Sequence, residues 1–149
     1  MQTQSYGPEA RGGASKSDVI ISGEEILFTE VQRPDYLLCL SQAAYDRYNK
    51  AMLPGSTLIY DPLFVSLAEL EGVRQIALPA TETAVSLGRR QVANIVALSG
   101  LCTISAVISQ EALLQAVLNR VPKDSKQLNQ NALQIGAELA QKAMEGEIA

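Results

Sequence analysis

Three short apolar runs, each closed by a turn signal, constrain the fold of this chain most. They lie at residues 36–40, 56–60 and 73–78. The first is apolar on both faces, which predicts a central strand of a sheet covered on both sides. Asp61-Pro62 ends the second run and Pro79 ends the third. Because helical patterns separate such runs, the sequence predicts an α/β layer fold with mostly parallel pairing.

Helical signals follow the strands at regular intervals. Ser41 and Ser109 stand where an N-cap is expected, since their hydroxyls can accept from the first free N–H groups. Ala112, Leu113, Ala116 and Val117 mark the expected inner face of the helix after Ser109. We expect helices at residues 43–52, 80–88, 92–108, 110–121 and 125–144.

The segment 92–108 is the most apolar part of the chain, and it is apolar on nearly every side. A buried helix and a membrane span both fit such a pattern. The segment contains Asn94 and Thr103 and is short for a bilayer, which needs about 20 apolar residues. We therefore expect a buried helix and no membrane span. Its small residues, Ala97, Ser99, Gly100 and Ser105, would permit close approach by another helix or by the sheet.

Two further apolar runs, 19–21 and 25–29, are separated only by Ser22-Gly23-Glu24. This arrangement predicts a β-hairpin and hence one antiparallel pair. With that pair added, we expect a mixed sheet.

A stretch from Ser5 to Ser15 is rich in glycine and also contains Pro8, Glu9 and Arg11. Such a composition excludes a helix interior or a regular strand, so it predicts a shaped loop. The planar fork of Arg11 suits a carboxylate or a phosphate, although it could equally brace the loop through Glu9. The glycines precede a strand rather than a helix, so a dinucleotide-binding fingerprint is poorly matched.

The chain contains no histidine among its 149 residues. It therefore cannot build a Ser-His-Asp, Cys-His or histidine-based metal site. A general base would have to be a carboxylate, lysine or tyrosine. The candidate carboxylates Glu9, Asp61 and Glu82 are better explained as caps or solvated turn residues. We expect no catalytic residue and no metal ligand in this chain.

The cysteines and the net charge narrow the functional class of the protein further. Cys39 and Cys102 stand in apolar surroundings without a C-x-x-C motif, which argues against an iron–sulfur cluster or a structural zinc. Those cysteines, and the lack of a secretory signal pattern, predict a cytoplasmic protein. A net charge of −4 argues against nucleic acid as a binding partner. We expect one domain, residues 1–149. It would be either a subunit supporting chemistry carried elsewhere or a freestanding Rossmann-like module binding a nucleotide or another small molecule.

The segment from Ser5 to Ile26 closely resembles the gamma subunit of 2-oxoacid:ferredoxin (acceptor) oxidoreductases. Arg11-Gly12-Gly13, followed by a small residue and a strand, is that family's most recognisable signature. The resemblance covers essentially the whole chain in order. It continues through Pro34-Asp35, Leu53-Pro54-Gly55, residues 76–82, Val92-Ala93-Asn94 and residues 131–136.

This resemblance implies a Rossmann-like, three-layer α/β/α domain inside a complex that oxidatively decarboxylates a 2-oxoacid. The complex would use coenzyme A and produce an acyl-CoA, carbon dioxide and reduced ferredoxin. Thiamine diphosphate would be held by the alpha and beta subunits, and the iron–sulfur clusters by beta or by a small ferredoxin-like delta subunit. Magnesium would also belong to subunits other than this chain. The form Tyr6-Gly7-Pro8-Glu9 is most similar to the 2-oxoglutarate branch; pyruvate and branched-chain 2-oxoacids stay open.

The resemblance also implies a role for the signature loop. It would lie at the subunit interface near the coenzyme A side of the active site, with Arg11 on a partner carboxylate or a ligand phosphate. The expected interface or ligand-contact residues are Tyr6, Gly7, Pro8, Glu9, Arg11, Gly12 and Gly13. In one respect the chain departs from the family pattern. It starts almost on the signature, so we expect it to lack a glycine-rich βαβ unit of roughly 30 residues.

Overall fold

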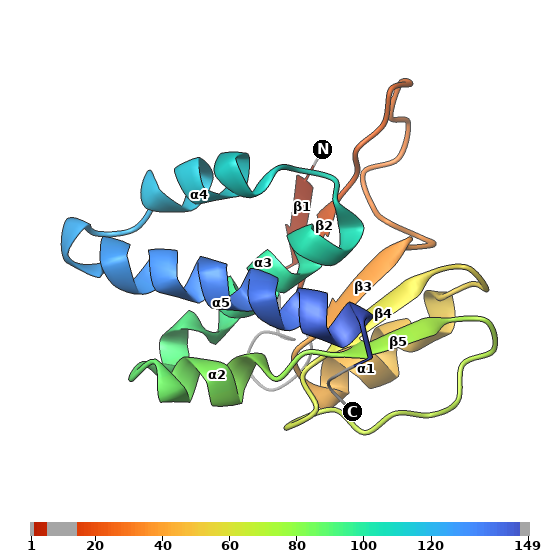
Figure 1. The fold of residues 1–149 in the computed structure, drawn as a ribbon. Helices are drawn as coiled ribbons and strands as arrows, with labels where there is room; N and C mark the ends of the chain where they lie inside the picture. Colours follow the sequence, from red (N-terminus) through yellow and green to blue (C-terminus); the bar gives the residue numbers. More distant parts are fainter. Residues whose placement is uncertain (1, 6–14, 147–149) are drawn as a thin grey trace.

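The computed structural model, which describes residues 2–5 and 15–146, contains a parallel sheet of three strands, at the lower right in Figure 1. Its strands are β3 (Tyr36–Cys39), β4 (Thr57–Tyr60) and β5 (Arg74–Ala77), adjacent in that order. Leu37 is level with Leu58, and Leu58 with Gln75. All three strands fall inside the predicted apolar runs, so the expected α/β class with parallel pairing is confirmed. The prediction that the first run forms a central strand is wrong for the described sheet, because β3 lies at its edge and pairs only with β4.

One face of the sheet is covered by helix α1 (Gln42–Tyr48) and by the irregular connection 61–73. Cys39 and Leu58, both fully buried, pack here against Tyr45 and Val65. The Tyr45 hydroxyl accepts a 2.8 Å hydrogen bond from the backbone N–H of Ala68, which ties the connection to the helix. The crossover from β4 to β5 is therefore held in place without a helix of its own.

The opposite face is covered by α3 (Ala93–Ser105) and α5 (Lys126–Met144), as Figure 1 shows. Alternation along β4 sends Ile59 to this side, where it packs with Leu78 and Ala140. Helices on both faces give three layers. The expected three-layer α/β architecture is confirmed.

Helices α3 and α5 pack closely through small residues. The Ser99 hydroxyl is fully buried and donates to the backbone carbonyl of Leu133. A Cβ added at Gly136 would lie 2.8 Å from Cβ of Ser99 and closer still to the carbonyl oxygen of Val96. Gly100 lies under the Leu78 side chain in the same manner. The prediction that small residues in 92–108 permit close approach is confirmed.

Asn94 is the one exposed residue of α3, which confirms the prediction of a buried helix for residues 93–105. The predicted helix extended to residue 108, but residues 106–108 follow the helix and are exposed. No helix in the described part of the chain combines the length and apolarity that crossing a membrane requires. Ala106 ends α3 in the left-handed region, at φ 54°.

The remaining helices complete the layers. Helix α2 (Ala80–Ser86) is followed by Gly88 at φ 89°, which confirms the expected glycine stop. Helix α4 (Gln110–Leu118) begins at Ser109, whose hydroxyl accepts from the Ala112 N–H at 3.1 Å. Leu113 and Val117 are buried as predicted, but Ala112 and Ala116 are exposed. Short 3₁₀ turns lie at η2 (Asn49–Ala51), η3 (Arg90–Val92) and η4 (Lys123–Ser125).

The predicted hairpin between residues 19–21 and 25–29 is wrong. Strand β2 (Lys16–Val19) pairs instead with β1 (Gln2–Ser5), antiparallel, in a separate two-stranded sheet. At the expected turn, the Glu24 N–H bonds to the Ser22 hydroxyl at 3.0 Å, a local turn that replaces strand pairing. An antiparallel pair is therefore present between other residues than predicted, and because it belongs to a separate sheet, the expectation of a mixed sheet is wrong for the described strands.

Candidate functional site

The predicted contact loop, residues 6–13, lies outside the described residues, but both of its flanks are placed. Ser5 is the register partner of Lys16, and Gln2 of Val19. The signature loop is thus the connection between the two antiparallel strands β1 and β2. Strand pairing fixes where the loop leaves the ribbon and where it returns.

A small polar network holds the β2 side of this loop. Lys16 Nζ lies 3.1 Å from Asp18 Oδ2, and that same oxygen accepts the backbone N–H of Val31 at 3.2 Å. The hydrogen bond to Asp18 raises the pKa of the Lys16 ammonium, so Lys16 keeps its positive charge at neutral pH. Lys16 also lies 5.9 Å from the centre of the Tyr48 ring on α1. The loop base is therefore attached to the layer that covers the sheet.

The carboxyl ends of the parallel strands are the usual ligand edge of an open α/β sheet. Here the polar groups at that edge serve the backbone. Asp61, directly after β4, is 1% exposed; its Oδ1 accepts the Leu63 N–H at 3.0 Å and its Oδ2 the Thr81 N–H at 2.9 Å. Ser41, after β3, accepts the Ala44 N–H at 3.2 Å and caps α1.

The structure shows the surroundings of two of the three candidate carboxylates, Asp61 and Glu82. Asp61 is a cap, as predicted, although it is buried rather than solvated. Glu82 is exposed in the first turn of α2, where an acidic side chain interacts favourably with the positive end of the helix dipole. Glu9 lies outside the described residues.

Neither cysteine is placed as a nucleophile or a ligand. Burial raises the pKa of the Cys39 thiol to about 12 and also raises that of Cys102. Both thiols are therefore protonated at neutral pH, whereas nucleophiles and metal ligands are thiolates. Within the described ranges, no three His, Cys, Asp or Glu side chains are grouped to hold a metal ion.

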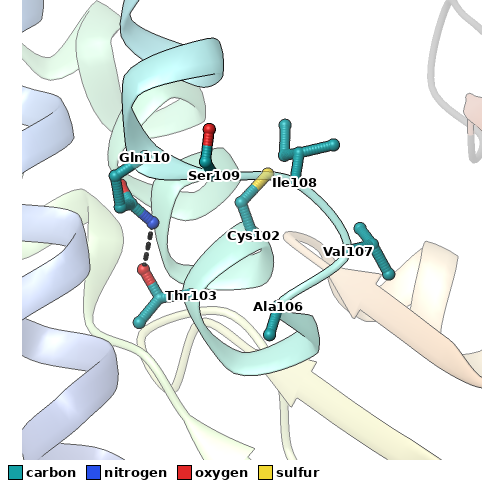
Figure 2. Close-up of a pocket in the computed structure, with 7 residues that line it drawn as sticks. All are labelled: Cys102, Thr103, Ala106, Val107, Ile108, Ser109 and Gln110. Carbon is teal, nitrogen blue, oxygen red and sulfur yellow. Dashed lines mark hydrogen bonds between the residues drawn. The ribbon is translucent and has the colours of Figure 1, made fainter.

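An open, mostly apolar hollow of about 450 Å³ lies at the junction of α3 and α4 (Figure 2). Cys102, Val107 and Ile108 contribute to it, and Gln110 Nε2 donates to Thr103 Oγ1 at its rim, 2.8 Å away. Its lining carries no charged side chain. It offers apolar contact and no acid or base.

A second hollow, of about 400 Å³, lies between η3 and the start of α5. Arg89 and Asp124 bring opposite charges to it, and buried Asn129 donates to the Ser125 carbonyl at 2.9 Å. No histidine, thiol or paired carboxylate lines it. Neither hollow contains a set of groups suited to nucleophilic or acid–base catalysis.

Sequence reasoning missed two features next to the candidate loop. It did not identify residues 2–5 as the partner strand of β2, because a short polar strand has no hydrophobic alternation to reveal it. It also assigned 25–29 to a strand, whereas Leu27 is 76% and Phe28 is 69% exposed in an irregular segment. The three acidic residues around them, Glu24, Glu25 and Glu30, were the available signal.

Fold and site together define a three-layer α/β domain whose polar groups at the ligand edge cap its own backbone. Residues 1–139 match the family described as pyruvate ferredoxin/flavodoxin oxidoreductase. The chain therefore belongs to this family.

Individual relatives agree with that assignment. The chain is 43% identical to 2-oxoglutarate synthase subunit KorC of Methanocaldococcus jannaschii, over 94% of this chain and 76% of that protein. It also superposes on the crystal structure of the keto/oxoacid ferredoxin oxidoreductase gamma subunit from Geobacter sulfurreducens. That match has a TM-score of 0.83 and 42% identity, and it covers 96% of this chain and 80% of the other.

A more distant relative has a different chain organisation. Ketoisovalerate oxidoreductase subunit VorA of Methanothermobacter marburgensis is 31% identical over 95% of this chain, which spans only 30% of that protein. In VorA, a region similar to this chain is therefore joined covalently to a much longer remainder.

Proposed function

We propose that this chain is the gamma subunit of a 2-oxoacid:ferredoxin oxidoreductase complex of the 2-oxoglutarate branch. The observation that carries the proposal is the 43% identity to a 2-oxoglutarate synthase subunit across nearly the whole chain. The complex would convert 2-oxoglutarate and coenzyme A into succinyl-CoA and carbon dioxide. The two electrons released would pass to ferredoxin, one to each of two molecules.

The role of the chain within the complex is structural. Asp61 and Ser41 are committed to backbone hydrogen bonds, and both thiols are buried and protonated. This donor set does not suit an iron–sulfur cluster. We accordingly assign thiamine diphosphate, magnesium, the clusters and the coenzyme A reaction centre to alpha and beta subunits, with or without a ferredoxin-like delta subunit. We place the complex in the cytoplasm, where free thiols such as Cys39 and Cys102 stay reduced.

We also propose that the signature loop contacts a partner subunit or coenzyme A. Tyr6, Gly7, Pro8, Glu9, Arg11, Gly12 and Gly13 form this loop, and the ribbon of β1 and β2 presents it. Glycine lets another backbone or a ligand come close, and Arg11 supplies a bidentate donor for a carboxylate or a phosphate. The polar network of Lys16 and Asp18 supports this role by fixing the loop base.

Replacing Arg11 with alanine tests the loop. A charge-assisted contact to a carboxylate or phosphate contributes on the order of 1.5–3 kcal/mol. We therefore expect the assembled complex to show a KM for coenzyme A, or a Kd for subunit assembly, that rises by roughly ten- to a hundredfold. Arg120→Ala, an exposed arginine after α4, is the matched control and should change neither constant. If both subunit assembly and coenzyme A dependence were unchanged, the contact proposal would be rejected, and Arg11 would only stabilise its own loop.

The proposed activity is tested by reconstitution from purified subunits. With this chain present, the complex should reduce ferredoxin in a reaction that requires coenzyme A. Its kcat/KM should be highest for 2-oxoglutarate when pyruvate and 2-oxoisovalerate are compared. A preference for either of those two acids would move the protein to another branch of the family. If the purified chain were monomeric, bound a nucleotide and ignored the other subunits, it would be a freestanding binding module instead.

A further inference from the structure

The segment joining β2 to β3 projects away from the layers of the domain (Figure 1). Residues 21–30, here called the arm, contain its most exposed apolar side chains. Leu27 is 76% exposed, Phe28 69% and Ile21 65%. Neighbouring Val19, at the end of β2, is 61% exposed. Clustered exposure of this kind is typical of an interaction surface rather than of a scattered surface leucine.

The arm is anchored at its base. On one side, the Val31 N–H bonds to Asp18 Oδ2 at 3.2 Å, which fastens the end of the arm to β2. Further along the same C-terminal side, the Asp35 carbonyl accepts the Thr57 N–H at 2.9 Å, at the start of the sheet. Within the arm, Glu24 and Ser22 form a local turn. The base is thus fixed while Leu27 and Phe28 face solvent, an arrangement that presents them at low entropic cost to a binding partner.

Charge on the arm indicates the chemistry of that partner. Glu24, Glu25 and Glu30 are all exposed, and residues 21–30 contain no lysine or arginine. A matching surface would have an apolar groove for Leu27 and Phe28 and basic side chains along its rim.

We propose that the arm docks into an apolar, basic-rimmed groove on the subunit equivalent to the remainder of the longer VorA-type chains. In VorA, a region similar to 95% of this chain and that remainder belong to one polypeptide, which supports the remainder as the partner. In the present protein the same neighbour would be a separate chain, and the arm would supply non-covalent attachment. This inference rests on the proposed function, because it takes the partner from the same complex.

The test measures binding of the full chain to that purified subunit. The double variant Leu27→Asp/Phe28→Asp should raise the Kd at least about tenfold, as loss of central apolar contacts does. The melting temperature of the free chain should stay unchanged, because both side chains are already exposed. Val85→Asp, on a valine of α2 that is 57% exposed and lies outside the arm, is the matched control and should bind like the wild type.

A second variant, Glu24→Lys/Glu25→Lys, tests the proposed basic rim of the partner's groove. It also replaces the first variant as the test of the arm if that variant misfolds. It should weaken binding at low salt and flatten the salt dependence of the Kd. Wild-type affinity in both variants would overturn the arm proposal and leave the proposed function standing. Failure of the wild-type chain to bind any subunit would overturn both. Dimerisation of the free chain that the variants abolish, with partner affinity unchanged, would make a second copy the occupant and would also overturn the proposal.

Discussion

Replacing Asp61 with alanine should lower the free energy of unfolding by about 3 kcal/mol or more. The carboxylate is 1% exposed and accepts two backbone N–H groups, from Leu63 and Thr81. Each buried donor left without an acceptor costs about 1–3 kcal/mol, and charged acceptors contribute at the upper end. Because Asp61 joins the end of β4 to the start of α2, its loss should loosen the carboxyl edge of the sheet. Chemical denaturation of the purified chain measures the change.

Two further variants separate a structural from a chemical role for Asp61. Asp61→Asn keeps one acceptor oxygen and should fall between wild type and Asp61→Ala in stability. Asp35→Ala removes an exposed carboxylate at the start of β3 and should change stability by less than about 0.5 kcal/mol. If Asp61→Asn were as stable as wild type but abolished turnover in the assembled complex, Asp61 would be a functional carboxylate and the cap assignment would be wrong.

Gly136→Ala should destabilise the chain by about 2 kcal/mol and lower its melting temperature by roughly 5 to 10 °C. Alanine is favoured over glycine in a helix by about 1 kcal/mol, so propensity alone predicts the opposite sign. The added methyl group, however, would meet the Val96 carbonyl and Ser99 Cβ of α3. One of these is backbone, and the Ser99 hydroxyl is committed to Leu133 in the same contact. Overpacking should therefore outweigh the gain in helix propensity.

Thermal unfolding of three variants checks this sign. Gly23→Ala introduces the same methyl group where nothing lies within 4 Å and should leave the melting temperature nearly unchanged. Gln130→Ala, exposed on the same helix, should be neutral or slightly stabilising. If Gly136→Ala were stabilising as well, α3 and α5 would not be packed as closely as the structure places them.

Much of the layered core could be predicted from local pattern. Runs such as 36–40 and 56–60 have strand length and are closed by turn signals, which favours strands over helices, and Ser41 and Ser109 stand where an N-cap is expected. The close packing at Gly136 was harder to predict from the sequence. A glycine inside a helix signals a packing reason, but the sequence does not say that the neighbour would be the backbone of α3.

The pairing of β2 could not be predicted in the same way, because it depends on a distant segment. The run 25–29 has strand composition, yet the Asp18 side chain takes the Val31 N–H, and β1 supplies the backbone partners of β2. Long-range pairing of this kind leaves no local signal. Of the candidate site, the sequence predicts that Asp61 is a cap or a solvated turn residue, but not that the signature loop connects two paired strands. The contacts of residues 6–13 stay a prediction.

The most direct test of the central claim is a cofactor and turnover assay on the purified chain, with the assembled complex measured in parallel. The chain should carry far less than one equivalent of iron, thiamine diphosphate or flavin, and it should not oxidise 2-oxoglutarate by itself. The complex should hold the cofactors and reduce an acceptor only when this chain is included. Stoichiometric cofactor on the isolated chain, or turnover without its partners, would contradict the account.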